Sequence, residues 1–461
     1  MLNHLSRSKK RRVVLDIETD SIDAVKNIWC VVCADIDSGE LFTFHDGMSI
    51  THRLPTFIKE ECKTVVGHNL IQYDIPWLLR FVPSISFDHL NIIDTLVLSR
   101  QWHFKLQGGH SLDAWGTRLN LKKGEFNDFS KYTQEMLDYC IRDVELNVKL
   151  FKFFEERLND PVWERSVRLE HDIAKVCKDM HANGFEFDIA GAKKLRNKLD
   201  ERLKELDVAL QEGFPPVPTP VRVVTPKETK FGTLSKVGFQ WVTDGDLSPF
   251  TAGASFTLFE WVPFNPSSTS QIVTRLNEAG WKPKDKTKGH IEALRKRDKI
   301  RIAKFKVSGW KVNEKNLSTL PKGAPQSAQT LSEYLLVSSR VSTLTEWING
   351  YWAHGGDDGR IHGTFNPIGT WTHRMSHVKP NLGNPVAPRS LYGKEMRSLF
   401  KVREGHKLVG CDASGIQLRI LAHYVNEEEF THNIVDGDPH QANKEALGEH
   451  CKTRDVAKTF I

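Results

Sequence analysis

One short segment near the N-terminus constrains this chain more than any other. The run Val13-Val-Leu-Asp-Ile-Glu18 alternates like a β-strand, so Asp16 and Glu18 share one face while Val13, Leu15 and Ile17 fill the other. Two carboxylates on one face of an apolar strand repel each other unless a cation lies between them. Such a pair also occurs on solvent-exposed strands, so the neighbouring segments must decide whether Asp16 and Glu18 are metal ligands.

More carboxylates follow in the settings that a metal pair requires. The segment Asn69-Leu-Ile-Gln-Tyr-Asp74 follows an apolar strand and places Asp74 where a helix can begin. Tyr139 and Asp143 are four residues apart, so they share one side of a predicted helix. Each acid alone is explained by helix capping or surface charge. The ordered set favours a two-metal phosphodiesterase, in which Mg²⁺ ions about 4 Å apart stabilise the attacking and leaving oxygens and Tyr139 orients the attacking water.

Composition sets the outer bounds of this interpretation. The chain has 461 residues, 39% apolar and 26% charged, which is typical of a soluble protein of roughly three domains. The sequence contains no run of about 18 apolar residues and no secretion signal, so no membrane association is expected. Seven scattered cysteines fit a reducing cytoplasm. Cys30 and Cys33 lie in a strand-like run, where their thiols should point to opposite faces as small core residues.

Positive charge is concentrated in one stretch of the chain. The net charge is only +6, but between Lys282 and Lys311 twelve Lys/Arg stand against three acids, a local net of +9. A solvated helix face is the ordinary explanation of such a run. Trp281, Phe305 and Trp310 are interleaved with the cations, which favours a surface that follows a phosphate backbone.

Periodicity divides the chain into regions. Short strands are predicted at 13–18, 28–34, 41–45 and 64–67, followed by a helix with an apolar repeat from Leu137 to Phe151. Residues 162–211 are helical with a break at Asn183-Gly184, and 213–262 form a Pro-, Thr- and Gly-rich insertion or large loop. Helices return after Asn265-Pro-Ser-Ser268 and over 328–352, and a Gly/Asp cluster at 355–359 opens a strand-turn-helix section.

The C-terminal part carries weaker signals of its own. Residues 408–423 read as an apolar strand that ends at Asp412 and leads into a helix. A buried acid at a strand end is costly unless it is paired or metal-bound, although Asp412 could equally cap the helix. Arg454 and Lys458 are four residues apart on a helical pattern, so they share one face. They could bind a polyphosphate together, or they could belong to a solvent-exposed helix face.

The order and spacing of these motifs resemble a known family. Asp16-Ile-Glu18, Asn69 to Asp74 and Tyr139 to Asp143 look like the three motifs of proofreading exonucleases with four acids and a tyrosine (DEDDy). The stretches 93–100 and 111–116 are similar to replicative family A DNA polymerases of short-tailed bacteriophages. The resemblance implies that Asp16, Glu18, Asp74 and Asp143 bind metal, that Tyr139 orients water, and that Asn69 contacts DNA during 3′–5′ excision.

The same resemblance extends to the C-terminal half. Asp412-Ala-Ser-Gly is similar to polymerase motif A, which implies that Asp412 and the Ala413 carbonyl hold catalytic Mg²⁺. Residues 453–461 look like the start of motif B. The implied contacts to the nucleotide and to primer–template DNA come from the following residues: Gln417, His440, Arg454, Lys458 and Arg397 at the incoming dNTP, and Arg374 at the DNA minor groove. Gln417 stands where the family usually has a glutamate that screens out ribonucleotides.

The resemblance also implies a fold and a division into domains. The fold expected is an α/β ribonuclease-H-like exonuclease followed by an α+β polymerase region with thumb and partial palm and fingers. The expected parts are as follows: 1–158 exonuclease, 159–212 connector and first thumb helices, 213–262 β-rich insertion, 263–354 rest of the thumb, 355–430 partial palm, and 431–461 start of the fingers. The insertion occupies the place where some relatives recruit thioredoxin, so a thioredoxin-like processivity factor is a further expected partner.

The sequence ends at Ile461 within a helical pattern, before the nucleotide-stacking tyrosine and the His-Asp motif that the family carries. The leading hypothesis is therefore the N-terminal part of a phage replicative polymerase, truncated or split, acting in the cytoplasm of an infected bacterium. Exonuclease activity with Mg²⁺ or Mn²⁺ is expected, and polymerisation is expected only with a second, C-terminal polypeptide. A stand-alone 3′ exonuclease and a non-catalytic DNA-binding subunit are the alternatives.

Overall fold

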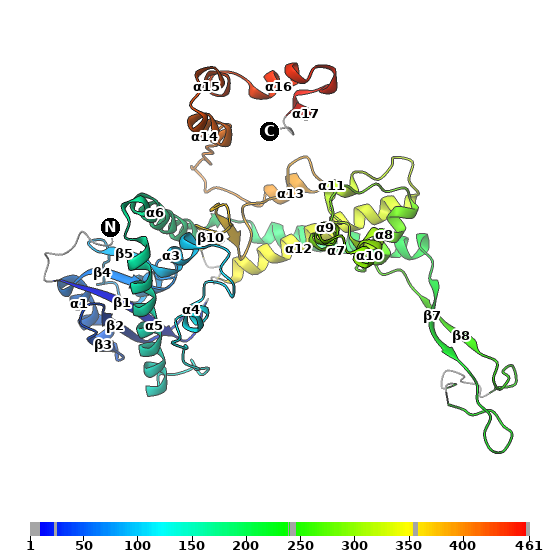
Figure 1. Cartoon of the computed structure of the whole chain (residues 1–461), viewed down its shortest axis with the longest axis horizontal. Coiled ribbons are helices and arrows are strands. Elements are labelled where there is room, and N and C mark those ends of the chain that lie inside the picture. The colour runs from blue at the N-terminus through cyan, green and yellow to red at the C-terminus, as the bar shows by residue number, and fades with distance from the viewer. Residues whose placement is uncertain (1–9, 23–24, 238, 240–245, 354–357, 458–461) are drawn as a thin grey trace. The chain divides into compact units, whose positions relative to one another are not determined.

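A computed structural model describes residues 10–22, 25–237, 239, 246–353 and 358–457 of the chain. It divides into two compact units, residues 1–401 and residues 402–461. The first unit contains a mixed sheet, several long helices and a two-stranded hairpin, whereas the second contains short helices (Figure 1). The predicted palm, 355–430, crosses the boundary between the units.

The first unit begins with a five-stranded sheet in the order β3-β2-β1-β4-β5. Its strands are β1 (Arg11–Thr19), β2 (Ile28–Asp35), β3 (Leu41–Phe44), β4 (Cys62–Gly67) and β5 (Asn91–Asp94). β1 pairs antiparallel with β2 and parallel with β4, so the strand that carries Asp16 and Glu18 is the centre of the sheet. The four predicted strands are confirmed, while β5 has too short an apolar run to be predicted.

Helices cover both faces of this sheet because β1 and β2 are apolar on both sides. Val13, Leu15 and Ile17 pack in one core cluster with α1 (Leu54–Glu61) and α2 (Asp74–Phe81). The opposite face is covered by α3 (Thr95–Trp102), α4 (Leu112–Arg118) and the long α5 (Gln134–Leu158), which crosses the sheet in Figure 1. Cys30 belongs to this second cluster and Cys33 to the first, as the strand alternation predicts.

Two further long helices form the next core of the first unit. α6 (Pro161–Asn183) ends at Gly184, whose φ of 58° lies in the left-handed region and where a Cβ atom would come within 2.7 Å of the His362 ring. α7 (Ile189–Gly213) packs against α12 (Gln326–Ala353), and their apolar side chains share one buried cluster. The predicted break at Asn183-Gly184 and the predicted helices on either side of it are confirmed.

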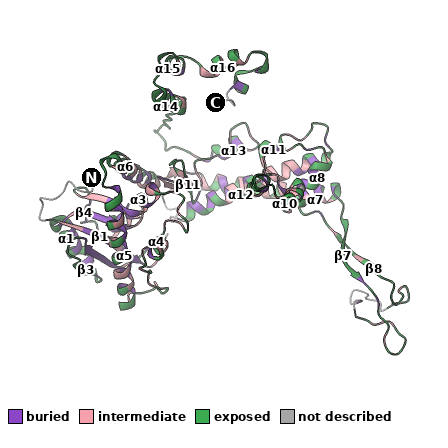
Figure 2. Ribbon diagram, viewed as in Figure 1, coloured by how far each residue is buried: buried purple, intermediate pink, exposed green. Residues whose placement is uncertain are grey.

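The insertion after α7 is a β-hairpin. β7 (Val217–Val224) pairs antiparallel with β8 (Phe256–Val262), and of the residues of these two strands only Val224 is buried. Figure 2 shows the hairpin as mostly exposed. Phe259 and Trp261 are 53% and 69% exposed, which is unusual for large apolar side chains.

The basic stretch lies in short helices between this hairpin and α12. Residues 282–311 include α9 (Lys288–Lys296) and α10 (Lys299–Ser308), and α8 (Thr269–Glu278) and α11 (Glu314–Leu317) flank them. Trp281 is buried, and the rings of Phe305 and Trp310 pack 5.9 and 5.2 Å from that of His290. The aromatic residues therefore build the local core, and most of the cations between them stay on the surface.

Short strands and one helix complete the first unit. β6 (Phe185–Glu186) pairs with β9 (Arg360–Ile361), and β10 (Thr364–Asn366) pairs with β11 (Ser376–Val378). The last helix is α13 (Gly393–Arg397). β10 packs against α6, and Gln72, near the start of α2, donates a hydrogen bond of 2.7 Å to the Phe365 carbonyl.

The second unit consists of α14 (Ile416–Val425), α15 (Glu428–Val435), α16 (Pro439–Leu447) and α17 (Arg454–Ala457). The strand predicted at 408–412 is wrong: these residues form an extended segment that is exposed along its length, with Val409 88% exposed. A strand requires a hydrogen-bonded neighbour, and none pairs with this segment among the described residues. The helix predicted to follow is confirmed as α14.

The α/β N-terminal region and the α+β region after it match the predicted fold class. Within the described part of the chain, no helix is long and apolar enough to cross a membrane.

Candidate functional site

The two acids of β1 lie on the face of the sheet that α5 covers. Glu18 is 8% exposed and Asp16 is half-buried. The Cys140 thiol of α5 lies 3.7 Å from the Asp16 carboxylate. Asp16, Glu18 and Cys140 each offer one potential ligand atom, and these three atoms lie within 4.8 Å of one another. Because burial raises the pKa of the Cys140 thiol well above its ordinary value, the thiol stays protonated, and we interpret Cys140 as a packing neighbour of the two carboxylates.

Asp74 reaches the same place from the start of α2. The sequence prediction that a helix begins at Asp74 is confirmed, and its side chain is buried at 2% exposure. Asn69 has a φ of 67° in the turn after β4, which reverses the chain before the helix. The side chain of Asp74 is close enough to Asp16 that the Asp16 charge contributes to the raised pKa of Asp74, after the larger effect of burial.

The turn at Asn69 is fixed by an acid that the sequence analysis did not single out as a site residue. Asp94, 2% exposed at the end of β5, accepts hydrogen bonds from the backbone N–H groups of Asn69 and Ile71 at 3.0 and 3.1 Å. It also caps α3 through the Leu96 N–H at 2.9 Å. The acid at the end of the apolar run Ile92-Ile93 was the only sequence signal for this role.

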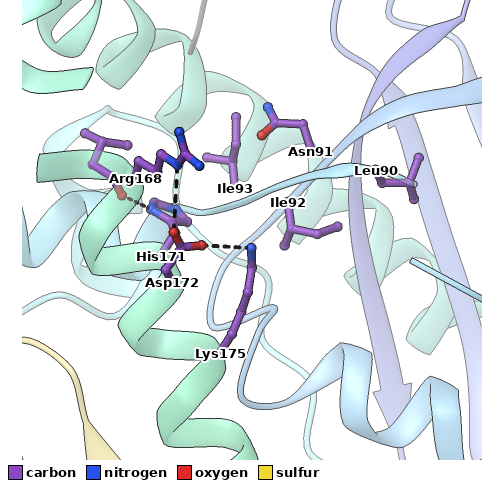
Figure 3. Close-up of a pocket in the computed structure, with 9 residues that line it drawn as sticks. Leu90, Asn91, Ile92, Ile93, Arg168, His171, Asp172 and Lys175 are labelled. Atoms are coloured by element: carbon purple, nitrogen blue, oxygen red, sulfur yellow. Dashed lines mark hydrogen bonds and ion pairs between the residues drawn. The ribbon is translucent and has the colours of Figure 1, made fainter. Parts of the chain in front are cut away.

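Asp94 is supported in turn by α6. The His171 ring accepts a hydrogen bond of 2.9 Å from the Asp94 backbone N–H, and burial lowers the pKa of His171, which keeps it neutral. Figure 3 shows His171 at a small pocket between α6 and β5, beside Arg168, Asp172 and Lys175. Asp172 pairs with both cations at 3.9 and 3.2 Å. Asp172 thus offsets one of the two positive charges at this pocket, and His171 links α6 to the end of β5.

Tyr139 and Asp143 lie on α5, as predicted, four residues apart on its sheet-facing side. Asp143 is 3% exposed, and its Oδ2 atom pairs with the Lys123 ammonium at 2.6 Å. Its Oδ1 atom is buried and has no hydrogen-bond partner among the described residues. The half-buried ring of Tyr139 packs against Phe126 and Phe129 at centroid distances of 5.8 and 6.3 Å.

The four carboxylates form one electrostatic unit. Burial, followed by the charge of Asp143, raises the pKa of Asp16 to about 7. Burial and then the charge of Asp16 raise the pKa of Glu18 to about 10. Burial also raises the pKa of Asp143, against the opposing effect of Lys123. A cluster that resists ionisation without further positive charge is well suited to hold divalent cations, for which carboxylate oxygens are the preferred ligands.

The residues predicted at the polymerase site are less closely assembled. Asp412 and Ala413 lie in the exposed extended segment before α14, and Gln417 is exposed in the first turn of that helix. Within the described range, the Asp412 side chain forms no hydrogen bond or ion pair. Lys458 lies outside the described residues.

His440 and Arg454 come together through an acid between them. Asp438 caps α16, accepting from the His440 N–H at 3.0 Å, and forms a two-pronged ion pair with the Arg454 guanidinium at 2.7 and 3.2 Å. The bond to Arg454 lowers the pKa of Asp438 to about 2. The Nδ1 atom of His440 is buried and has no hydrogen-bond partner in the part of the chain that the structure describes. Two of the predicted nucleotide-binding residues thus share one small cluster.

The remaining predicted contacts belong to the first unit. Arg374 is exposed in the turn between β10 and β11, next to Trp371, which is 65% exposed. The Arg397 guanidinium donates to the backbone carbonyls of Val386 and Pro385 at 2.6 and 3.3 Å, so it braces the segment before α13.

Comparison with known proteins finds similarity to DNA polymerases. The family model described as DNA polymerase family A matches residues 258–460. The DNA-directed DNA polymerases of Escherichia phage T7 and Enterobacteria phage T3 are each 28% identical, over 97% of this chain and 74% of the relative. Residues 258–460 thus resemble DNA polymerase family A, and nearly the whole chain is similar to the two phage polymerases.

Two more distant matches are similar in sequence or in fold. DNA polymerase I of Rhizobium leguminosarum is 30% identical over 29% of this chain and 13% of the relative. Among solved structures, the POL domain of Pol1 from M. smegmatis, in complex with DNA primer-template and dNTP, shares the fold with a TM-score of 0.62 at 16% identity. That match covers 98% of this chain and 66% of the other.

Proposed function

We propose that this chain removes nucleotides from the 3′ end of DNA by metal-dependent hydrolysis, as the proofreading activity of a phage replicative polymerase. The observation that carries the proposal is the buried acid cluster of Asp16, Glu18, Asp74 and Asp143. Burying four acids together is costly unless a cation compensates them. Their position on the central strand and its covering helices makes the cluster rigid.

The residues present fit a pair of divalent ions. The buried Oδ1 atom of Asp143 has no hydrogen-bond partner among the residues described, and the charges of neighbouring acids contribute to the raised pKa values of Asp16, Glu18 and Asp74. Asp16, Glu18, Asp74 and Asp143 would hold two Mg²⁺ ions, for which Mn²⁺ can substitute. When bound, such ions stabilise the attacking and leaving oxygens of phosphodiester hydrolysis.

Other side chains supply orientation at the same site. The Tyr139 hydroxyl lies beside the acid cluster and would orient the attacking water, because its ring is fixed by Phe126 and Phe129. Asn69, in the turn before Asp74, would contact the DNA strand. A single-stranded 3′ end is the substrate that a proofreading site requires.

A nuclease assay on 3′-labelled single-stranded DNA tests this proposal. The wild-type chain should release nucleotides in Mg²⁺ or Mn²⁺, and the Asp16→Ala, Glu18→Ala double variant should lose this activity. Residual digestion by the double variant at the wild-type rate would overturn the assignment. Salt-sensitive DNA binding without any metal-dependent cleavage would instead favour a non-catalytic DNA-binding subunit.

We also propose that the C-terminal part contributes to nucleotidyl transfer on primer–template DNA with dNTPs. Asp412 and the Ala413 carbonyl would hold Mg²⁺, and the contacts to the nucleotide would come from Gln417, His440, Arg397, Arg454 and Lys458. Arg374 would contact the primer–template minor groove. The proposed division keeps 1–158 as the exonuclease and 159–461 as connector, thumb, insertion, partial palm and start of the fingers.

We propose that this polymerase site is completed by another polypeptide, and the exposure of apolar side chains in the second unit supports this. Leu408, Val409 and Ile420 are 67%, 88% and 50% exposed. Apolar side chains that are exposed together often mark an interaction surface. A C-terminal polymerase fragment would cover these side chains. The chain alone should not extend a primer, whereas template-directed extension by the chain alone would contradict this part of the proposal. The site of action would be the cytoplasm of an infected bacterium.

The exposed aromatic side chains of the β7–β8 hairpin favour a second protein partner. Its exposed Phe259 and Trp261 would bind a thioredoxin-like processivity factor, since a two-stranded hairpin with uncovered aromatic residues gains stability when a partner packs on it. Size-exclusion chromatography with purified bacterial thioredoxin should show co-elution that Trp261→Ala weakens. Separate elution of the two wild-type proteins would rule this partner out.

A further inference from the structure

We infer that Lys123 is a positioning residue of the exonuclease site, where its ammonium group holds the Asp143 carboxylate and the Tyr139 hydroxyl in their working arrangement. This inference rests on the proposed exonuclease function. Lys123 lies in the loop between α4 and α5, and the sequence analysis gave it no role.

The contacts of the Lys123 side chain lead to two site residues at once. Its Nζ atom lies 2.6 Å from Asp143 Oδ2 and 4.9 Å from the centroid of the Tyr139 ring. Burial raises the pKa of the Tyr139 hydroxyl, and the nearby Lys123 ammonium opposes this rise. The side chain is only 26% exposed, so it is not a surface lysine that meets an acid by chance. A single ammonium with three donors can serve both groups.

The loop around Lys123 is built to hold it there. The Arg142 guanidinium of α5 donates to the Lys122 carbonyl at 3.2 Å, which ties the loop to the helix that carries Tyr139 and Asp143. A Cβ atom at Gly124 would lie 3.1 Å from the Tyr139 ring, so the glycine lets the backbone approach the tyrosine closely. Phe126, two residues further on, packs on the same ring.

Lys123 is also the recurrent positive partner of the acid cluster. Its charge opposes the rise in the pKa of Asp16, Glu18 and Asp143, and Asp143 in turn raises the pKa of Lys123 although burial alone would lower it. One ammonium compensates only one of the four acids. It occupies one oxygen of Asp143 and leaves the other, Oδ1, without a partner. Lys123 can therefore stay in place when a divalent ion binds the cluster.

Steady-state kinetics on 3′-labelled single-stranded DNA, with Lys123→Ala and Lys123→Arg, test this role. Because misplacing a reacting group by about 1 Å can cost about 100-fold in rate, we expect Lys123→Ala to lower kcat by about 10- to 100-fold. KM should change little, because the DNA contacts remain. Lys123→Arg, which keeps the charge, should recover most of kcat. Lys122→Ala, which changes the exposed neighbouring side chain, is the matched control and should behave as wild type.

Calorimetric titration with Mn²⁺ provides a second measurement that does not depend on turnover. Removing Lys123 leaves Asp143 without its positive partner, so Lys123→Ala should bind Mn²⁺ as tightly as wild type or more tightly while kcat falls. A merely structural lysine would lower kcat and Mn²⁺ affinity together, and that result would overturn the inference. An unchanged kcat in Lys123→Ala, or no recovery in Lys123→Arg, would also overturn it. If the wild-type chain shows no excision, the proposed function fails instead.

Discussion

The acid cluster of the N-terminal sheet and the segment around Asp412 make an instructive comparison. Both place carboxylates after apolar sequence, and in both the sequence predicts metal ligands by resemblance to one family. In the first region the acids are buried and electrostatically linked, and their loops are held by Asp94 and Lys123. In the second, Asp412 is exposed on a segment without a paired strand. A motif thus indicates which residues act, while the surrounding packing decides whether the chain assembles them by itself.

The largest expected effect is the difference in excision rate between one substitution in the first region and one in the second. Asp74→Asn keeps the shape of a buried ligand but removes its charge, so we expect excision of single-stranded DNA to fall on the order of 10³-fold. Asp412→Asn should leave excision at the wild-type rate. Rates on a 3′-labelled oligonucleotide measure both. Equal losses in the two variants would mean that the regions do not act separately.

A second prediction concerns the support of the Asn69 turn. Asp94→Ala would leave the buried N–H groups of Asn69 and Ile71 without their acceptor, so the free energy of unfolding should fall by about 3 kcal/mol. Urea denaturation measures this change. Asp88→Ala, at an exposed aspartate of the same region, should change it by less than about 0.5 kcal/mol. A similar small change in Asp94→Ala would show that the turn does not depend on Asp94.

The site acids and the residues that support them show how much of the site can be predicted from the sequence. Asp16 and Glu18 could be predicted because strand alternation fixes which side chains share a face, and Tyr139 and Asp143 because helix spacing does the same. Asp94 and Lys123 act through contacts between segments distant in the chain, and their immediate sequence resembles an ordinary helix cap and an ordinary basic loop. The strand predicted at 408–412 failed because an apolar run becomes a strand only when another strand pairs with it.

A third prediction concerns how the apparent metal affinity of the acid cluster depends on pH. The pKa of Asp16 is raised to about 7 and that of Glu18 to about 10, so protons occupy these ligands near neutral pH. A divalent ion must displace them, and its apparent affinity should therefore rise with pH by roughly tenfold per unit for each proton displaced.

Calorimetry with Mn²⁺ between pH 6 and 8, in buffers of different ionisation enthalpy, measures both affinity and proton release. The Asp16→Ala, Glu18→Ala variant serves as the control, since it lacks the two titrating ligands. An affinity that is constant with pH would show that the acids are already ionised and that the cluster is less strongly coupled than its burial indicates.

The smallest expected effect concerns backbone accessibility. Residues 402–413 have no helix or strand and are exposed, whereas the sheet strands are buried. Limited trypsin digestion, followed by mass spectrometry, should cut at Arg403 or Lys407 at least about tenfold faster than within β1. Earlier cleavage within the sheet would reverse the order of stability that separates the two regions.

The central claim is that Asp16, Glu18, Asp74 and Asp143 hold divalent ions for 3′ excision. Anomalous X-ray scattering from crystals grown with Mn²⁺ tests it most directly, because the peaks locate the ions without reference to activity. The account predicts strong peaks in contact with the carboxylates of Asp16 and Asp143. Fully occupied Mn²⁺ sites elsewhere in the chain, with no peak at these acids, would contradict it.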